Sequence, residues 1–196
     1  MISLALLQSA RNIHLRIVYP DMINYLRLFI ELCLFRQQAE NIPRSESLLL
    51  VTGLVAVLSA AANAAPEEGF IRGLLLSGCQ IILFSGMIWL ALNFKGKSER
   101  WVQTLTGIFG ATTVLQLLTL PLFGWQESLV SPDTGQLVVT LPLIIVAAIA
   151  IWSLTVMASI LRQALEIRIG GAILLVILCQ ATVLFIISML IGSPSP

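Results

Sequence analysis

The chain is poor in charged residues, which make up only 11% of its 196 residues, whereas hydrophobic residues make up 58%. A soluble domain carries roughly 25% charged residues. Together with a mean hydropathy of +0.96, this composition indicates a polytopic membrane protein. The net charge of +1 provides no overall field to attract nucleic acid, so we expect no nucleic-acid partner.

Residues that carry catalysis or bind metals are also scarce. The one histidine, His14, precedes every apolar run, so a Ser–His–Asp set cannot form inside the membrane. Without clustered Cys or carboxylates it cannot build a typical metal site. The three cysteines show no CxxC pairing and are interpreted as small apolar packing residues. No GxSxG, HExxH or Gly-rich phosphate loop is present, so we expect no enzymatic activity and no cofactor.

What the sequence does contain is five apolar runs. Each has about 18 or more residues, enough to cross a hydrocarbon core of about 30 Å at 1.5 Å per residue. We expect all five to be helices, because a helix satisfies its own backbone hydrogen bonds in lipid. No Asp, Glu, Lys, Arg or His lies inside a run, which argues against an ion-driven pump. The runs cover residues 48–65, 74–94, 102–123, 138–161 and 172–191.

The positive charges lie in alternate connecting segments. If every run crosses the membrane, ten of the 11 Lys and Arg residues fall on one side and only Arg72 on the other. The positive-inside rule then places the N-terminus in the cytoplasm and the C-terminus outside. We therefore expect an all-α, five-span membrane protein. Its parts are an arm at 1–21, a cytoplasmic helix and turn at 22–47, a transmembrane domain at 48–192 and a tail at 193–196.

Residues 22–38 are expected to form an amphipathic helix that lies in the membrane plane. Asn24, Arg27, Glu31 and Gln38 form one polar stripe, in which Arg27 and Glu31 are an i,i+4 pair. Two interpretations remain open, a helix that docks on the membrane surface or on a partner, and a helix that packs under the bundle. Because this compact pattern begins at Met22, both Met1 and Met22 remain candidates for the natural start. Pro43 ends the segment, and Ser45 is expected to cap the next helix.

Three glutamines lie inside the apolar runs. Gln80, Gln116 and Gln180 could line a path for a substrate, or could each bond to a neighbouring helix. We expect the second arrangement, because an unpaired amide in hydrocarbon is costly. Pro121 and Pro142 are expected to shape the ends of their helices, and Trp152 is interpreted as an interfacial anchor.

Two stretches resemble sequences of the Yip family of small membrane proteins. They are LRLFIELCLFRQQAENIPRSESLLL at 26–50 and IWSLTVMASILRQALEIRIGGAILLVI at 151–177. The layout of a short N-terminal region followed by five close spans over 22–192 is similar to that of the short bacterial members. The resemblance to the bacterial members implies a helical bundle in the bacterial inner membrane. The DLYGP-type motif of the members that bind prenylated Rab GTPases is absent, so no site residue is carried over.

Two functions follow as hypotheses. The first is a structural or interaction protein that contacts anionic lipids, another membrane protein or a second copy of the chain through its basic side. The second is a small transporter or channel subunit for a neutral solute, lined by the three glutamines. A continuous wet cavity around these glutamines would favour the second. The expected interaction surface consists of Arg27, Glu31, Arg36, Lys95, Lys97, Arg100, Arg162 and Arg168.

Overall fold

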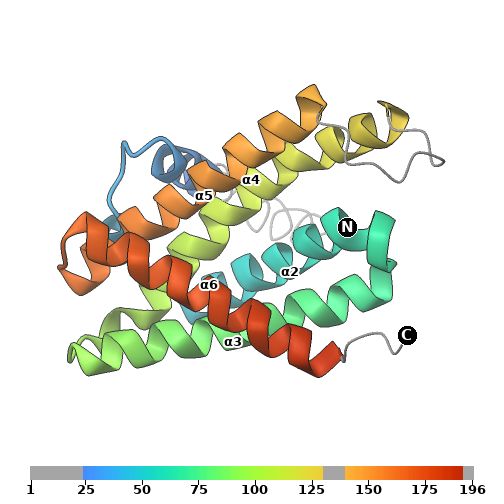
Figure 1. Cartoon of the computed structure of the whole chain (residues 1–196). Helices are drawn as coiled ribbons and strands as arrows, with labels where there is room; N and C mark the ends of the chain where they lie inside the picture. Colours follow the sequence, from blue (N-terminus) through green and yellow to red (C-terminus); the bar gives the residue numbers. More distant parts are fainter. Residues whose placement is uncertain (1–23, 130–139, 192–196) are drawn as a thin grey trace, which may run out of the picture.

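The computed structural model describes residues 24–129 and 140–191, and all regular structure within these ranges is helical (Figure 1). The arm at 1–21, with His14, the first residues of the fourth apolar run and the tail at 193–196 lie outside the described residues. A short helix at 24–33 is followed by α2 (Glu46–Glu68), α3 (Phe70–Phe94), α4 (Trp101–Leu129), α5 (Leu141–Leu165) and α6 (Ile169–Ile191). Two 3-10 turns, η1 (Ala39–Asn41) and η2 (Ser98–Arg100), precede α2 and α4.

The five long helices are each long and apolar enough to cross a membrane, and they correspond to the five predicted spans. The fold class is thus confirmed as all-α with five candidate membrane helices, as in a multi-pass membrane protein. Ser45 caps α2 as expected, because its side chain accepts a hydrogen bond from the Leu48 amide at 3.3 Å. Pro142 lies in the first turn of α5, where its missing N–H costs nothing.

Pro121 does not end its helix, contrary to the expectation. It lies inside α4, which continues to Leu129, past the predicted end at 123. A proline removes only one backbone N–H donor, and the turns on either side keep their own hydrogen bonds. α4 is therefore the longest of the five long helices, with 29 residues.

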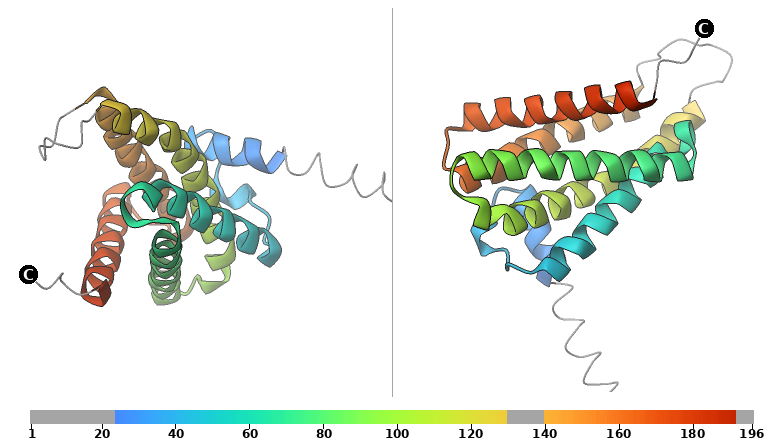
Figure 2. Two further views of the ribbon diagram at one scale, coloured as in Figure 1. Left: turned by 90° about the vertical axis from the view of Figure 1, so that its right-hand side faces the viewer. Right: turned by 90° about the horizontal axis from the view of Figure 1, so that it is seen from below.

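The helix α4 is the central element. In its most apolar stretch 56% of the residues are buried, against 17–22% in the other four long helices. It packs against α2 and α5, while α3 packs against α2 and α6, and α6 packs against α5. The five helices therefore enclose a ring in the order α4, α2, α3, α6, α5, which Figure 2 shows from two directions.

The two ends of this ring differ. At one end, α5 and α6 are joined by a three-residue turn in which Glu166 adopts a left-handed φ of 53°. The turn between α3 and α4 lies at the same end, and so does η1, which bonds to Gln103 and Gln163. At the other end, the start of α5 and the end of α6 diverge (Figures 1 and 2). We call the first the basic end, since it holds Arg36, Lys95, Lys97, Arg100, Arg162 and Arg168.

The N-terminal helix is shorter than predicted and packs against the bundle. It ends at Cys33 because Phe35 adopts a left-handed φ of 57° and the Arg36 amide bonds back to the Glu31 carbonyl at 2.9 Å. Gln38 therefore does not belong to its polar stripe. Phe29 is buried against α4, where a Cβ at Gly110 would overlap its ring. Of the two interpretations, the structure therefore favours the helix that packs on the bundle. The angle of this helix to the membrane plane stays a prediction.

Trp152 holds this helix from the other side. It lies in the middle of α5, so it is not an anchor at a helix end as expected. Its indole N–H donates to the Cys33 carbonyl at 2.9 Å, and its ring lies 5.5 Å from that of Phe35. The Cys33 thiol in turn donates to the Ala111 carbonyl of α4 at 3.4 Å. The N-terminal helix is thus bonded to both α4 and α5.

Candidate intramembrane binding cavity

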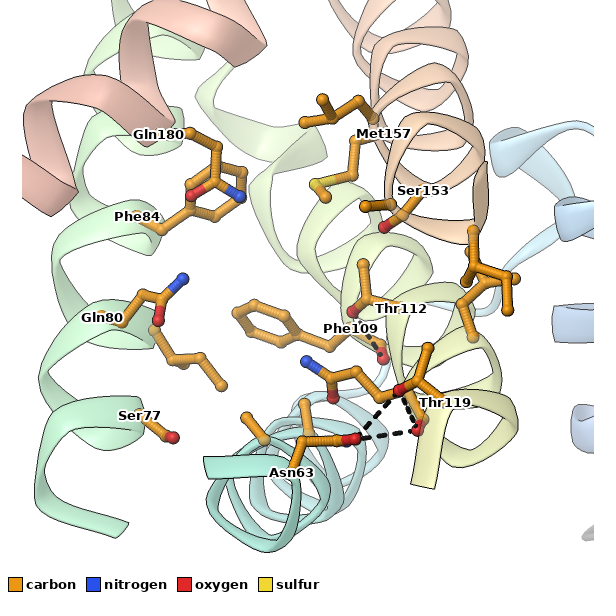
Figure 3. Close-up of a pocket in the computed structure, with 18 of the residues that line it drawn as sticks. Asn63, Ser77, Gln80, Phe84, Phe109, Thr112, Thr119, Ser153, Met157 and Gln180 are labelled. Atoms are coloured by element: carbon orange, nitrogen blue, oxygen red, sulfur yellow. Dashed lines mark hydrogen bonds between the residues drawn. The ribbon is translucent and has the colours of Figure 1, made fainter. Parts of the chain in front are cut away.

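A cavity of about 620 Å³ lies inside the ring and is lined by all five long helices (Figure 3). It reaches from the middle of the bundle toward the end opposite the basic end, because its lining residues lie between positions 56 and 64 on α2, 108 and 123 on α4, and 146 and 157 on α5. Eight of the lining residues are polar and uncharged: Asn63, Ser77, Gln80, Thr112, Gln116, Thr119, Ser153 and Gln180. All three glutamines singled out in the sequence therefore face one cavity.

The lining follows from helical periodicity. On α3 it uses Ser77, Gln80, Ile81 and Phe84, spaced three, one and three residues apart, which places them on one face. Each of the other helices contributes a similar stripe. The apolar part of the wall includes Phe109, which projects into the cavity from α4 (Figure 3).

Gln116 is bonded to a neighbouring helix, as expected. Its side-chain oxygen accepts a hydrogen bond from the Ser59 hydroxyl of α2 at 2.6 Å. The Asn63 amide donates to the Gln116 backbone carbonyl at 3.2 Å, and the Thr119 hydroxyl donates to the Asn63 side-chain oxygen at 2.9 Å. These bonds join α2 to α4 along one wall of the cavity (Figure 3). This wall is therefore a rigid part of the site.

For Gln80 and Gln180 the expectation of a hydrogen bond to a neighbouring helix is wrong. Neither side chain forms a hydrogen bond with any residue that the structure describes, and both line the cavity. Figure 3 shows them on α3 and α6, on the opposite side of the cavity from Ser153 and Met157. The reason is geometric: α3 and α6 present these amides to an open space instead of to a packed helix.

The chemistry of this lining favours an uncharged ligand. No ionisable side chain is among the lining residues of the described chain. Burying a charge without a partner is far more costly than burying a neutral polar group. Each free amide offers two donors and one acceptor oxygen, so the pair can bond a hydroxyl, carbonyl or amide group. In the two described ranges no group of three or more His, Cys, Asp or Glu could hold a metal.

Sequence reasoning missed the apolar walls of the cavity. Phe84, Phe109 and Met157 were read only as part of apolar runs, because a fully apolar helix gives no signal of which face meets a cavity. Asn63 was seen only as a polar residue in the first span. Its spacing from Ser59 is four residues, and this i,i+4 pattern of polar groups could have indicated a bonded face.

Two of the predicted surface cations, Lys97 and Arg100, form ion pairs with other residues of the chain. Lys97 lies 2.5 Å from a carboxylate oxygen of Glu166, and Arg100 lies 3.2 Å from the other oxygen and 3.9 Å from Glu40. The hydrogen bond and charge of Lys97, followed by the charge of Arg100, lower the pKa of Glu166. These contacts join the turn between α5 and α6 to the turn before α4.

The remaining predicted surface residues are accessible at the basic end. Arg27 pairs with Glu31 at 2.8 Å on the exposed face of the N-terminal helix, and its hydrogen bond lowers the pKa of Glu31. The other four are exposed and form no ion pair with a described residue. They are Arg36, Lys95, Arg162 and Arg168.

Two further glutamines close the basic end, and the sequence analysis did not single them out. The Gln103 side chain donates to the Glu40 and Ile42 carbonyls at 2.7 and 2.8 Å. The Gln163 side chain accepts from the Ala39 amide at 2.8 Å. Together they attach η1 to α4 and α5. These bonds hold η1 against the ends of α4 and α5 that lie at the basic end.

Residues 26–50 contact residues 151–177 through the bond from Trp152 to Cys33 and the bond from Ala39 to Gln163. Comparisons of the chain with protein-family models, with curated proteins and with solved structures found no match.

Proposed function

We propose that the protein is a small carrier or channel-type subunit that binds a neutral molecule inside the membrane. The observation that supports this is the pair of unbonded amides, Gln80 and Gln180, which face one cavity among five apolar helices. An amide without a partner in a low-dielectric environment costs about 1–3 kcal/mol. A ligand with a neutral hydrogen-bonding group would supply the missing bonds, and a charged one would find no counter-charge in the lining.

The proposal includes a location and an orientation. We place the protein in a bacterial cytoplasmic membrane, with the basic end in the cytoplasm and the end of α6 outside. The exposed cations Arg36, Lys95, Arg162 and Arg168, gathered at one end of the bundle, support this orientation through the positive-inside rule. The cavity would then extend from the middle of the membrane toward its outer face.

The test is native mass spectrometry of the intact protein extracted in mild detergent. The double variant Gln80→Leu, Gln180→Leu removes both free amides at nearly constant volume. Ser188→Ala, an exposed position on α6, serves as the matched control. We expect the wild type and the control to carry a bound neutral small molecule, and the double variant to lose it while its thermal stability in detergent is kept.

The molecule so identified is then loaded into proteoliposomes, and its release is measured for the same three proteins. A wild type that carries no neutral molecule, or a double variant that keeps it and releases it at the wild-type rate, would contradict the proposal. A folded double variant that no longer releases the molecule would support it.

A second candidate is the Yip-like interaction protein that the sequence suggests. It is favoured by the four exposed cations of the basic end, which suit anionic lipid headgroups at about 1 kcal/mol each. The same spectra test it through the double variant Arg162→Gln, Arg168→Gln. If this candidate is right, bound anionic lipid or a copurified partner chain falls in that variant, and bound neutral lipid does not.

A further inference from the structure

We propose that the ligand is a neutral amphiphile that enters from the lipid bilayer, sideways between α5 and α6, and places its polar head on Gln80 and Gln180. This inference rests on the proposed function and names its substrate class and its route. Three observations carry it: where the lining is exposed, how deep the opening lies, and how polar and apolar groups are divided over the wall.

The exposure of the lining residues locates the opening. Leu184 on α6 is 60% exposed, and Ala150 on α5 is also exposed. The lining residues of α2, α3 and α4 are all buried or half-buried. The cavity is therefore open between α5 and α6, the two helices that diverge from their shared turn (Figure 1).

The depth of the opening decides what it faces. Ala150 follows the start of α5 at Leu141 by about 14 Å, and Leu184 precedes the end of α6 at Ile191 by about 10 Å, at 1.5 Å per residue. In a hydrocarbon core of about 30 Å, both positions lie among acyl chains and below the headgroups. A molecule already dissolved in the bilayer reaches this opening directly, whereas a water-soluble solute would first have to cross lipid.

The wall offers an amphiphile both unbonded polar groups and apolar surface. The free amides lie on α3 and α6, and apolar side chains such as Phe109, Leu154 and Met157 lie across the cavity, whereas the polar groups Asn63, Gln116 and Thr119 are bonded between α2 and α4. The apolar body of the ligand can pack on these apolar side chains while its hydroxyl or ester group bonds the free amides. The absence of any ionisable lining residue in the described chain disfavours a phosphate head. Monoacylglycerols and long-chain alcohols belong to the class that fits.

The probe is a monoacylglycerol with a photoactivatable diazirine in its acyl chain. The full-length protein is placed in nanodiscs of phosphatidylethanolamine and phosphatidylglycerol, irradiated with the probe, and its labelled peptides are mapped. We expect labelling on the cavity face of α5 and α6. Unlabelled monoolein should compete, and glycerol, the water-soluble head alone, should not.

Variants of the opening make the test specific. Ala150→Trp and, from the other rim, Leu184→Trp should fill the opening and reduce labelling about tenfold, the equivalent of about 1.4 kcal/mol in occupancy. Ala148→Trp is the matched control, because Ala148 is exposed on α5 but does not line the cavity. Two rim variants are used so that the loss of fold in one does not remove the test.

The outcomes separate the inference from the proposed function. If both rim variants are labelled like the wild type, or if glycerol competes as well as monoolein, the lateral route is wrong. The neutral cavity still stands in that case provided that Gln80→Leu with Gln180→Leu lowers occupancy. If the glutamine variant is labelled like the wild type, the proposed function fails too. Equal labelling by a photoactivatable phosphatidic acid would overturn the neutral class.

Discussion

The basic end and the cavity half of this bundle both contain glutamines and differ in how these side chains are satisfied. At the basic end Gln103 and Gln163 are bonded to the backbone of the segment before α2, and Glu166 is paired with Lys97. In the cavity half Gln80 and Gln180 bond to no described residue. A glutamine in a membrane protein is thus a stabilising residue or a binding residue according to what faces it.

Packing divides the molecule in the same way. Around the basic end the helices bury Leu92, Leu105, Leu161 and Val176 almost completely. The N-terminal helix adds Phe29 to this core. Toward the other end α5 and α6 separate and leave the cavity between the helices. We infer that stability is concentrated at the basic end and that the cavity half is the part able to accept a ligand.

The largest effect is expected from the docking site of the N-terminal helix. Gly110→Ala places a methyl group where the Phe29 ring lies, and it should lower the free energy of unfolding by about 1–3 kcal/mol. Gly86→Ala, with nothing near its position on α3, should be neutral or stabilising by up to about 1 kcal/mol. The measurement is thermal or denaturant unfolding in detergent. Equal behaviour of the two variants would mean that this helix does not contribute to the packed core.

A smaller effect should distinguish the bonded from the unbonded glutamines. Gln116→Leu removes the acceptor of Ser59 and should cost about 1 kcal/mol of stability. Gln180→Leu removes an amide that has no bond within the described chain, so stability should stay the same or rise. Both variants are compared with the wild type by thermal unfolding in the same detergent. A Gln180 variant less stable than the Gln116 variant would contradict the distinction between bonded and unbonded glutamines.

The smallest effect concerns pH. Because Lys97 lowers the folded-state pKa of Glu166, this carboxylate stabilises the fold above its ordinary value of 4.5. That stabilisation is lost as the pH falls through the lowered pKa that Glu166 has in the folded protein. Wild type should therefore unfold at a slightly higher temperature than Glu166→Gln at neutral pH, and the gap should close in acid. Because the Lys97–Glu166 ion pair is partly exposed to solvent, the difference in unfolding temperature should be small.

The control for this experiment is Glu99→Gln, an exposed carboxylate in η2 that forms no ion pair within the described part of the chain. Its unfolding temperature should follow that of the wild type across the pH range. A gap between wild type and Glu166→Gln that persists in acid would show that the residue acts through packing and not through its charge.

The sequence by itself determined the number and approximate bounds of the long helices. Runs of this length and apolarity have no other stable form in lipid, and Ser45 and Pro142 mark helix starts for local backbone reasons. The alternation of basic segments also indicated which turns share an end. The ion pairs of Arg100 with Glu40 and Glu166 are consistent with that arrangement.

Only the tertiary structure decided which face of each helix meets a neighbour, a cavity or lipid. The long helices are apolar on all sides, so hydrophobic periodicity, which locates the buried face of a helix in a soluble protein, gives little signal here. The end of the N-terminal helix at Cys33 is bonded to Trp152 and Ala111, which lie far from it in the sequence. Likewise, Gln116 is bonded and Gln180 is not, because α2 lies against α4 while α6 diverges from α5.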